Sequence, residues 1–314
     1  MKIVFLDRKT IGDDIDLSSF YKLGEVVEYG FTSYQEAPER TKDADVLVIN
    51  KVKIDQHTIG NAKNLKLVCV TATGTNNLDK DYLDKRGIQW RNVAGYSTDS
   101  VAQHTFAMLF YLLEHMKYYD NYVSQGNYIN DTLFTHFDKK FNQISDMTWG
   151  IIGLGAIGRK VADIATAFGA KVIYYSASNG APQEGYTQVD FNTLLSTSDI
   201  VSIHAPLNQY TENLIDENAL KLMKPSAILI NVGRGPIINE AHLAAALNEN
   251  TIAAAGLDVL SVEPMSPDNP LLAVTNKDKL LITPHIGWAS ITARTNLMNI
   301  IAGQIKDFYD NTDN

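Results

Sequence analysis

Residues 149–158 read WGIIGLGAIG, an apolar run that leads into a glycine-rich turn and then into a helical pattern. A G-x-G-x-x-G string alone is a weak signal, but between a strand and a helix it is typical of dinucleotide-binding turns. Its glycines would allow a tight turn, close approach of a pyrophosphate and close helix–strand packing, and the helix start would offer free N–H groups to the anion. We therefore predict a dinucleotide site formed by Gly153, Leu154, Gly155, Ala156, Ile157 and Gly158.

The choice between NAD and NADP depends on the end of the next expected strand, Lys171–Tyr175. In dinucleotide-binding folds an acidic residue at this point usually binds the ribose 2′-hydroxyl and disfavours a 2′-phosphate. Here Ser176 follows the strand, and no acidic or basic residue occurs from Ser176 to Gln183. We predict NAD as the cofactor and leave NADP open, because Ser176 takes the place of the usual acid.

Outward from this turn, short β-branched runs alternate with helical patterns, which is typical of parallel βαβ units covered by helices. In the first third the expected strands are Ile3–Leu6, Val26–Tyr29, Val46–Ile49 and Leu67–Val70, with helical stretches at Ser33–Arg40 and Leu78–Arg86. From Trp149 onward the further expected strands are Lys171–Tyr175, Ile200–His204, Ala227–Asn231, Ala253–Asp258 and Leu280–Thr283. Later helices are expected at Ile157–Phe168, Glu240–Leu247 and Ile291–Tyr309.

A long helical pattern begins near Ser97, because Val101, Thr105 and Met108 recur at spacings of three and four. It gives way to residues 118–147, which are rich in Tyr, Asn, Asp and Phe. We expect this segment to be either a surface loop packed on its own chain or an arm that contacts another subunit.

Composition limits the classes of protein that fit. The chain has 314 residues, of which 45% are apolar, and 27 basic against 36 acidic side chains give a net charge of −9. This composition is typical of a globular protein, and the length favours two domains. The acidic balance, without a cluster of Lys and Arg, argues against a nucleic-acid partner.

The N-terminus and the single cysteine, Cys69, bear on location. Residues 1–7 form a short apolar run ending in a charge, unlike the apolar core of a signal peptide. No apolar run approaches the roughly 18 residues of a membrane span. Cys69 lies between two valines and resembles a buried core thiol. We therefore expect a soluble, cytoplasmic protein without a membrane partner.

Several motifs resemble the D-isomer-specific 2-hydroxyacid dehydrogenase family, most of all its glycerate dehydrogenase (hydroxypyruvate reductase) members. The motifs are TATGTNNLD at 71–79, NVAGYSTDSVAQHT at 92–105, HAPLN at 204–208, NVGRG at 231–235, LDVLSVEP at 257–264 and TPHIGWAS at 283–290. They extend over most of the chain in the family's order. The resemblance implies an NAD(P)-dependent oxidoreductase that acts as a homodimer on a small 2-oxo or 2-hydroxy acid.

The resemblance maps a catalytic trio onto Arg234, Glu263 and His285. Reduction of a 2-oxo acid requires a hydride for the carbonyl carbon, a proton for its oxygen and a cation for the carboxylate. Arg234 would supply planar charged donors, and histidine, with an unperturbed pKa near 6.5, suits a general acid. Glu263, if it is hydrogen-bonded to His285, would favour the protonated ring.

The resemblance also assigns substrate and cofactor contacts. The backbone amides at Thr73 and Gly74 would hold the substrate carboxylate, and Trp288 would shape the substrate pocket. Asp258 would bind the nicotinamide carboxamide. The remaining positions assigned to the cofactor are His204, Ala205, Pro206, Thr211, Asn231, Val232, Gly233 and Gly287. No metal site is expected.

Together these observations predict an α/β protein with two Rossmann-like domains, each built on a parallel sheet. The NAD(P)-binding domain, residues 100–288, would be inserted into a discontinuous substrate-binding domain of residues 1–99 and 289–314. The expected reaction is NAD(P)H-dependent reduction of hydroxypyruvate or glyoxylate to D-glycerate or glycolate. One alternative is a D-lactate dehydrogenase or a D-2-hydroxyacid dehydrogenase for branched-chain substrates. An alternative of another class is an NAD(H)-sensing, corepressor-like binding protein.

Overall fold

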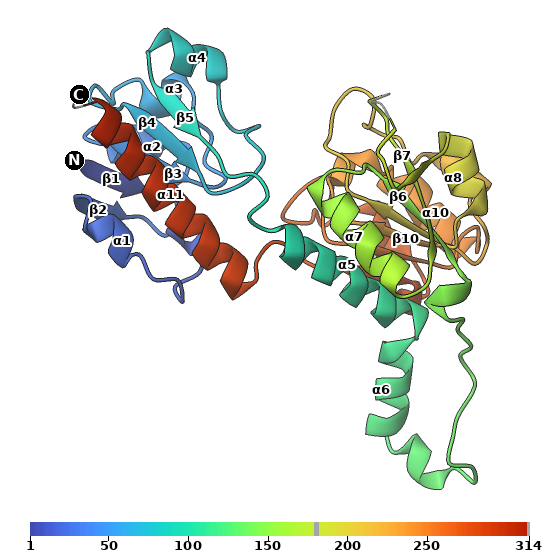
Figure 1. The fold of residues 1–314 in the computed structure, drawn as a ribbon. Coiled ribbons are helices and arrows are strands. Elements are labelled where there is room, and N and C mark those ends of the chain that lie inside the picture. The colour runs from blue at the N-terminus through green and yellow to red at the C-terminus, as the bar shows by residue number, and fades with distance from the viewer. Residues whose placement is uncertain (179–181, 313–314) are drawn as a thin grey trace. The chain divides into compact units, whose positions relative to one another are not determined.

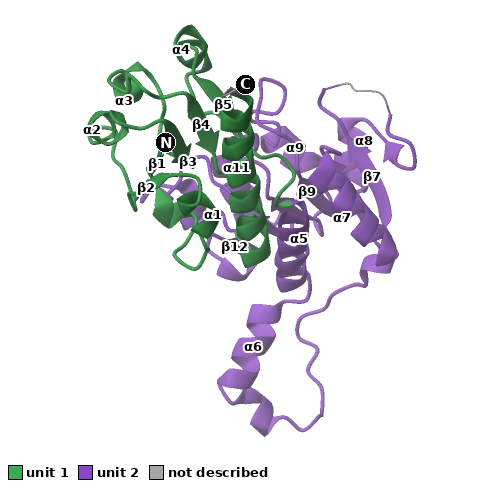
Figure 2. Cartoon of the chain, turned by 60° about the vertical axis from the view of Figure 1, so that its left-hand side comes forward, with its two compact units in different colours: residues 1–97, 288–314 green, residues 98–287 purple. Residues whose placement is uncertain are grey.

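The computed structural model describes residues 1–178 and 182–312 and divides into two compact units, coloured separately in Figure 2. Unit 1 comprises Met1–Ser97 and Trp288–Asn314, and unit 2 comprises Thr98–Gly287. These boundaries differ by one or two residues from the predicted domains 1–99 with 289–314 and 100–288. Residues 313–314 of the predicted span lie outside the described residues.

Unit 1 is built on a parallel five-stranded sheet in the order β2-β1-β3-β4-β5. The strands are β1 (Lys2–Phe5), β2 (Glu25–Glu28), β3 (Val46–Ile49), β4 (Leu67–Val70) and β5 (Gln89–Arg91). Its helices and 3-10 turns are η1 (Arg8–Thr10), α1 (Ser18–Tyr21), α2 (Ala37–Thr41), α3 (Gln56–Ile59), α4 (Lys80–Lys85) and α11 (Ile291–Thr312).

Both faces of the unit 1 sheet are covered. Along β1 the side chains alternate between faces, so Ile3 and Phe5 join one apolar cluster while Val4 joins the other. The first cluster is closed by α11, whose Leu297 and Ile301 are fully buried against the sheet. Because α11 comes from the end of the chain, unit 1 is discontinuous in sequence (Figure 1).

Unit 2 is built on a parallel seven-stranded sheet in the order β12-β11-β10-β9-β6-β7-β8. The strands are β6 (Thr148–Ile152), β7 (Lys171–Tyr175), β8 (Thr187–Gln188), β9 (Ile200–Ile203), β10 (Ile228–Asn231), β11 (Ala254–Leu257) and β12 (Leu280–Ile282). The chain builds outward from β6 to one edge and then returns to pair β9 with the other side of β6. This is the doubly wound order of dinucleotide-binding folds, with its switch point between β6 and β9.

Helices cover both faces of the unit 2 sheet (Figure 1). The pair α5 (Thr98–Leu113) and α7 (Ala156–Ala167) packs on one face around the buried Trp149. The other face carries α8 (Phe191–Thr197), α9 (Glu217–Leu222) and α10 (Glu240–Asn248). Short 3-10 turns occur at η2 (Asn127–Asn130), η3 (Ile144–Asp146), η4 (Gly235–Ile237), η5 (Pro270–Ala273) and η6 (Lys277–Lys279). Within the described residues, no helix combines the length and apolarity needed to cross a membrane.

The predicted elements are found with their ends shifted by up to four residues, and two edge strands were not predicted. β5 carries Gln89 and Arg91 on either side of one aromatic residue, and β8 has only two residues, so neither has a recognisable apolar pattern. The prediction of a helix over residues 33–36 is wrong, because they form a turn in which Ser33 hydrogen-bonds to Glu36 before α2 begins.

Residues 116–141, called here the arm, extend from the rest of unit 2 (Figure 1). The arm contains α6 (Met116–Ser124), which buries none of its residues. It folds back on itself, because the Tyr122 and His136 rings stack with centroids 3.9 Å apart and the Tyr122 hydroxyl donates to Asp131. The arm nevertheless leaves large apolar side chains exposed, namely Ile129, Leu133, Phe134, Phe137 and Phe141. A solvent-exposed apolar surface of this kind is typical of protein contacts.

Candidate active site

The candidate residues of unit 2 gather at the carboxyl edge of its sheet, because each follows a parallel strand. The glycine turn follows β6, Ser176 follows β7 and His204 follows β9. The trio is distributed in the same way: Arg234 lies after β10, Glu263 after β11 and His285 after β12. In open α/β sheets ligands bind outside this edge, at the switch point.

The glycine turn has the geometry that a dinucleotide needs. Gly153 has φ +91°, and a Cβ there would lie 2.7 Å from the backbone of Ala205, so the turn presses directly on the loop after β9. A Cβ at Gly158 would lie 2.2 Å from the carbonyl oxygen of Gly153. At Gly155, by contrast, a Cβ would meet nothing within 4 Å. Gly155 also has no side chain to cap α7, so open space adjoins free amides, which fits a pyrophosphate.

At the ribose end of the predicted site, Ser176 stands where an acidic residue is usual. The Ser176 hydroxyl lies 3.2 Å from that of Ser178. Arg159, which was not among the predicted site residues, extends from α7 and donates to Leu154 O in the glycine turn and to Gln183 Oε1. Within residues 176–183, whose lack of charged side chains bears on the choice of coenzyme, residues 179–181 lie outside the described residues.

His204 is half-buried and hydrogen-bonds to the strand that precedes it. Its Nε2 lies 2.9 Å from the Ser202 hydroxyl, which also accepts from the Trp149 indole. Burial lowers the pKa of His204 to about 3, so the ring is neutral. Among the described residues its buried Nδ1 has no hydrogen-bond partner. A neutral ring of this kind suits a lining or binding role and not proton transfer.

Thr211 lies in the loop after β9, where its contacts are internal. It is 1% exposed, and its hydroxyl donates to Pro206 O while accepting from Asn208 N. The structure therefore shows Thr211 fixing the shape of this loop, whereas direct contact with a phosphate stays a prediction.

The buried Asn231 shapes the loop that carries Arg234. Its carboxamide donates to Arg234 O and accepts from Gly233 N. A Cβ at Gly235 would lie 1.9 Å from the carbonyl carbon of Leu260, so this loop rests directly on the one that leads to Glu263. Among the described residues, the Arg234 guanidinium donates through Nη1 to Gly233 O.

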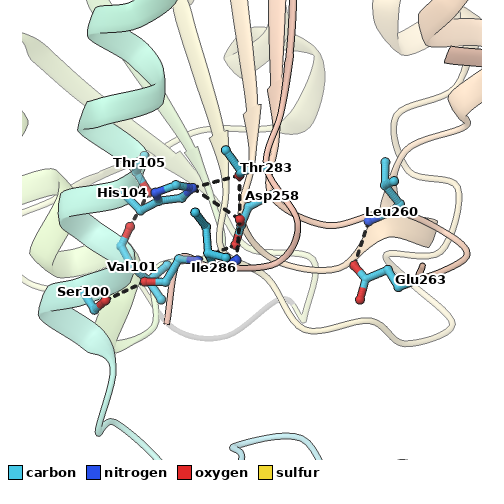
Figure 3. A network of polar contacts seen from close by, with 10 residues as sticks. Ser100, Val101, His104, Thr105, Asp258, Leu260, Glu263, Thr283 and Ile286 are labelled. Carbon is cyan, nitrogen blue, oxygen red and sulfur yellow. Dashed lines mark hydrogen bonds and ion pairs between the residues drawn. The ribbon is translucent and has the colours of Figure 1, made fainter. Parts of the chain in front are cut away.

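Glu263 and His285 form a hydrogen-bonded pair, with His285 Nδ1 2.8 Å from Glu263 Oε2. The other carboxylate oxygen, Oε1, accepts from Leu260 N and so holds the glutamate in place (Figure 3). An ionised carboxylate can only accept, which puts a proton on Nδ1 and leaves Nε2 to exchange a proton with a ligand. His285 itself has φ 56°, in the left-handed region.

Asp258 fixes the loop around His285 (Figure 3). Its Oδ1 accepts from Ile286 N and the Thr283 hydroxyl, and its Oδ2 accepts from Gly287 N. Burial alone would raise the pKa of Asp258, but hydrogen bonds from His104, Thr283 and the two amides bring it below its ordinary value. A carboxylate offers about four acceptor positions, so Oδ2 retains capacity for a further donor.

The predicted substrate residues of unit 1 have these contacts within their own unit. Thr73 donates through its hydroxyl to Val93 O and accepts at its carbonyl from Asn92. The adjacent Gly74 is partly exposed. Trp288 packs against the apolar cluster of unit 1, with its ring 6.4 Å from that of Tyr96. Across the described residues, no group of three or more His, Cys, Asp or Glu side chains has the arrangement of a metal site.

The chain is similar to known proteins of one enzyme family. Residues 106–287 match the family model "D-isomer specific 2-hydroxyacid dehydrogenase, NAD binding domain". The chain is 38% identical to a putative 2-hydroxyacid dehydrogenase of Haemophilus influenzae, covering 98% of both chains. It is 38% identical to a glycerate dehydrogenase of Methylorubrum extorquens, covering 98% of this chain and 94% of the relative.

A solved structure of similar fold is an acyclic imino acid reductase in complex with NADPH and D-Arg. Its TM-score is 0.86 at 31% identity, covering 99% of this chain and 98% of that one. The family-model match spans more than half of the chain, and the two relatives extend the similarity over nearly all of it. The chain therefore belongs to the D-isomer-specific 2-hydroxyacid dehydrogenase family.

Proposed function

We propose that the chain catalyses NAD(P)H-dependent reduction of a small 2-oxo acid to the D-2-hydroxy acid, with hydroxypyruvate and glyoxylate as its main substrates. The observation that carries this proposal is the Glu263–His285 pair, placed at the same sheet edge as an open glycine turn. The similarity to a glycerate dehydrogenase supports the choice of substrates.

In this proposal His285, Glu263 and Arg234 each have a separate role in the reduction. A bound reduced nicotinamide supplies the hydride that forms the new C–H bond at the carbonyl carbon. His285 donates the Nε2 proton to the carbonyl oxygen, while Glu263 holds Nδ1 and stabilises the ring's positive charge. Arg234 binds the carboxylate and polarises the carbonyl. In the reverse direction, the neutral His285 ring accepts the hydroxyl proton.

Further positions have supporting roles in this proposal. Asp258 uses its remaining acceptor capacity for the nicotinamide carboxamide, and His204, Ala205 and Pro206 line the adenosine side. The backbone amides at Thr73 and Gly74 bind the substrate carboxylate, and Trp288 shapes the substrate pocket. Unit 1 is accordingly assigned as the substrate-binding domain and unit 2 as the cofactor domain.

The substrate proposal is tested by comparing kcat/KM on hydroxypyruvate, pyruvate and 2-oxoisocaproate with both coenzymes. We expect hydroxypyruvate to be the best of the three. A preference for pyruvate or 2-oxoisocaproate would instead identify a D-lactate dehydrogenase or an enzyme for branched 2-oxo acids. Dinucleotide binding without turnover of any 2-oxo acid would favour a corepressor-like sensor.

Substitution His285→Gln removes the proposed acid, and kcat should fall at least about 100-fold because general acid catalysis contributes factors of this size. The Kd of NADH should change little, since the glycine turn is untouched. Steady-state kinetics and fluorescence titration measure the two effects. His57→Gln, on the surface of unit 1, serves as the control that retains activity. Full activity in His285→Gln would contradict the mechanism.

For the coenzyme, we propose that NAD is preferred and that Ser176 leaves NADP usable. Ser176→Asp should lower the NADPH-to-NADH ratio of kcat/KM about fivefold, since like charges about 4 Å apart in water repel by about 1 kcal/mol. The matched control is Ser176→Asn, which adds no charge. An unchanged ratio in the aspartate variant would show that residue 176 does not select the coenzyme.

For assembly, we propose a homodimer in which the arm contacts the second subunit, because the arm exposes Phe134 (90%) and Phe137 (69%). Light scattering at micromolar concentration should give twice 34.8 kDa. Phe134→Asp should shift the mass toward the monomer, whereas Phe31→Asp on unit 1, where the side chain is 72% exposed, should not. A wild-type protein of 34.8 kDa alone would rule out this proposal.

A further inference from the structure

The loop that carries His285 is hydrogen-bonded to helix α5 as well as to Asp258. From the first turn of α5, the Ser100 hydroxyl donates to Gly287 O over 2.7 Å. One turn later, His104 Nε2 lies 3.0 Å from the Thr283 hydroxyl and 3.3 Å from Asp258 Oδ1. Residues four apart share a helix face, so α5 holds the loop at points before and after His285 (Figure 3).

The hydrogen-bond pattern determines which way these bonds run. The Thr283 hydroxyl has one proton and donates it to Asp258 Oδ1 over 2.6 Å. Its oxygen must therefore accept from His104, and the ionised Asp258 carboxylate can only accept. Consequently, Nε2 of His104 carries a proton and acts as a shared donor to both groups.

Gly287 shows how tightly the loop is held. Its N–H donates to Asp258 Oδ2 while its carbonyl accepts from Ser100, so both polar groups of one residue are fixed by different elements. A Cβ on Gly287 would lie 2.8 Å from Asp258 Oδ2 and 3.3 Å from His104 Cδ2. Asp258 and His104 have only 3% and 17% of their side chains exposed, which leaves little room for an alternative arrangement.

We propose that Ser100 and His104 are positioning residues, which set the orientation of the His285 ring by holding the ends of its loop against α5. Neither acts on substrate directly. The inference rests on the proposed role of His285 as the acid, because a proton donor displaced by about 1 Å can lose about 100-fold in rate. Without the His104 donor, the buried Asp258 and the half-buried Thr283 each lose a hydrogen-bond partner and the loop is free to shift.

The test compares His104→Leu, which removes the donor, with His104→Gln, whose amide offers an N–H at a similar reach. In the leucine variant kcat on hydroxypyruvate should fall about 10- to 100-fold, with KM and the Kd of NADH little changed. The glutamine variant should restore kcat to near the wild-type value. Gln103→Leu, an exposed neighbour on α5, is the control for the helix.

A second readout does not depend on turnover. The Hε1 resonance of the His285 ring, identified by its loss in His285→Gln, should move at fixed pH in His104→Leu and in Ser100→Ala, and should return in His104→Gln and Ser100→Thr. If the wild-type protein turned over no 2-oxo acid, the proposed function would be refuted but the positioning proposal would not. The His285 resonance would then still test whether the contacts with α5 hold the His285 loop.

The proposal is overturned if folded His104→Leu or Ser100→Ala keeps both kcat and the His285 resonance. It is also overturned if His104→Gln is as impaired as His104→Leu, because the donor would then not be what matters. Should His104→Leu fail to fold, Ser100→Ala carries the test.

Discussion

A buried carboxylate must be met by hydrogen-bond donors, and at Asp258 this requirement brings together the end of β11, the loop after β12 and the first turns of α5. The amides of two successive residues and one hydroxyl point at a single side chain. The backbone on the far side of His285 is thereby held at a sheet edge, and the left-handed conformation at His285 is stabilised by its surroundings. With this backbone fixed, the hydrogen bond to Glu263 orients the His285 ring.

Close approach of backbones at glycine connects the other loops to this centre. Gly235 brings the Arg234 loop against Leu260, and Gly153 brings the turn after β6 against Ala205. In both places a side chain would force the loops apart. Residues that lie far apart in sequence therefore occupy one edge of one sheet. Direct contact between the loops suits a site that must place a hydride donor and a proton donor on one carbonyl group.

Much of this architecture was predictable, because strand ends and glycine turns are local patterns. The turn at 153–158 and the strands on either side of it were predicted from local patterns, and the three proposed catalytic residues were assigned from the family's motifs. The strands β5 and β8 were missed because edge strands of two or three residues, with at most one apolar residue each, are too short to show an apolar period. The hydrogen bonds of Ser100 and His104 connect residues about 180 positions apart in sequence, and no local sequence pattern predicts such contacts. Likewise, only the contacts show that Thr211 uses its hydroxyl inside its own loop.

The late position of α11 has a consequence for how the chain is made. When residues 1–97 leave the ribosome, their sheet has the cluster around Ile3 and Phe5 uncovered, because the helix that closes it is encoded after all of unit 2. At roughly 5–20 residues per second, synthesis of the intervening segment takes on the order of 10–40 s. Unit 2 is continuous and can fold during that time, whereas unit 1 has to wait with an apolar face open to solvent or to chaperones. Of the two units, the one whose sheet is synthesised earlier is thus completed later.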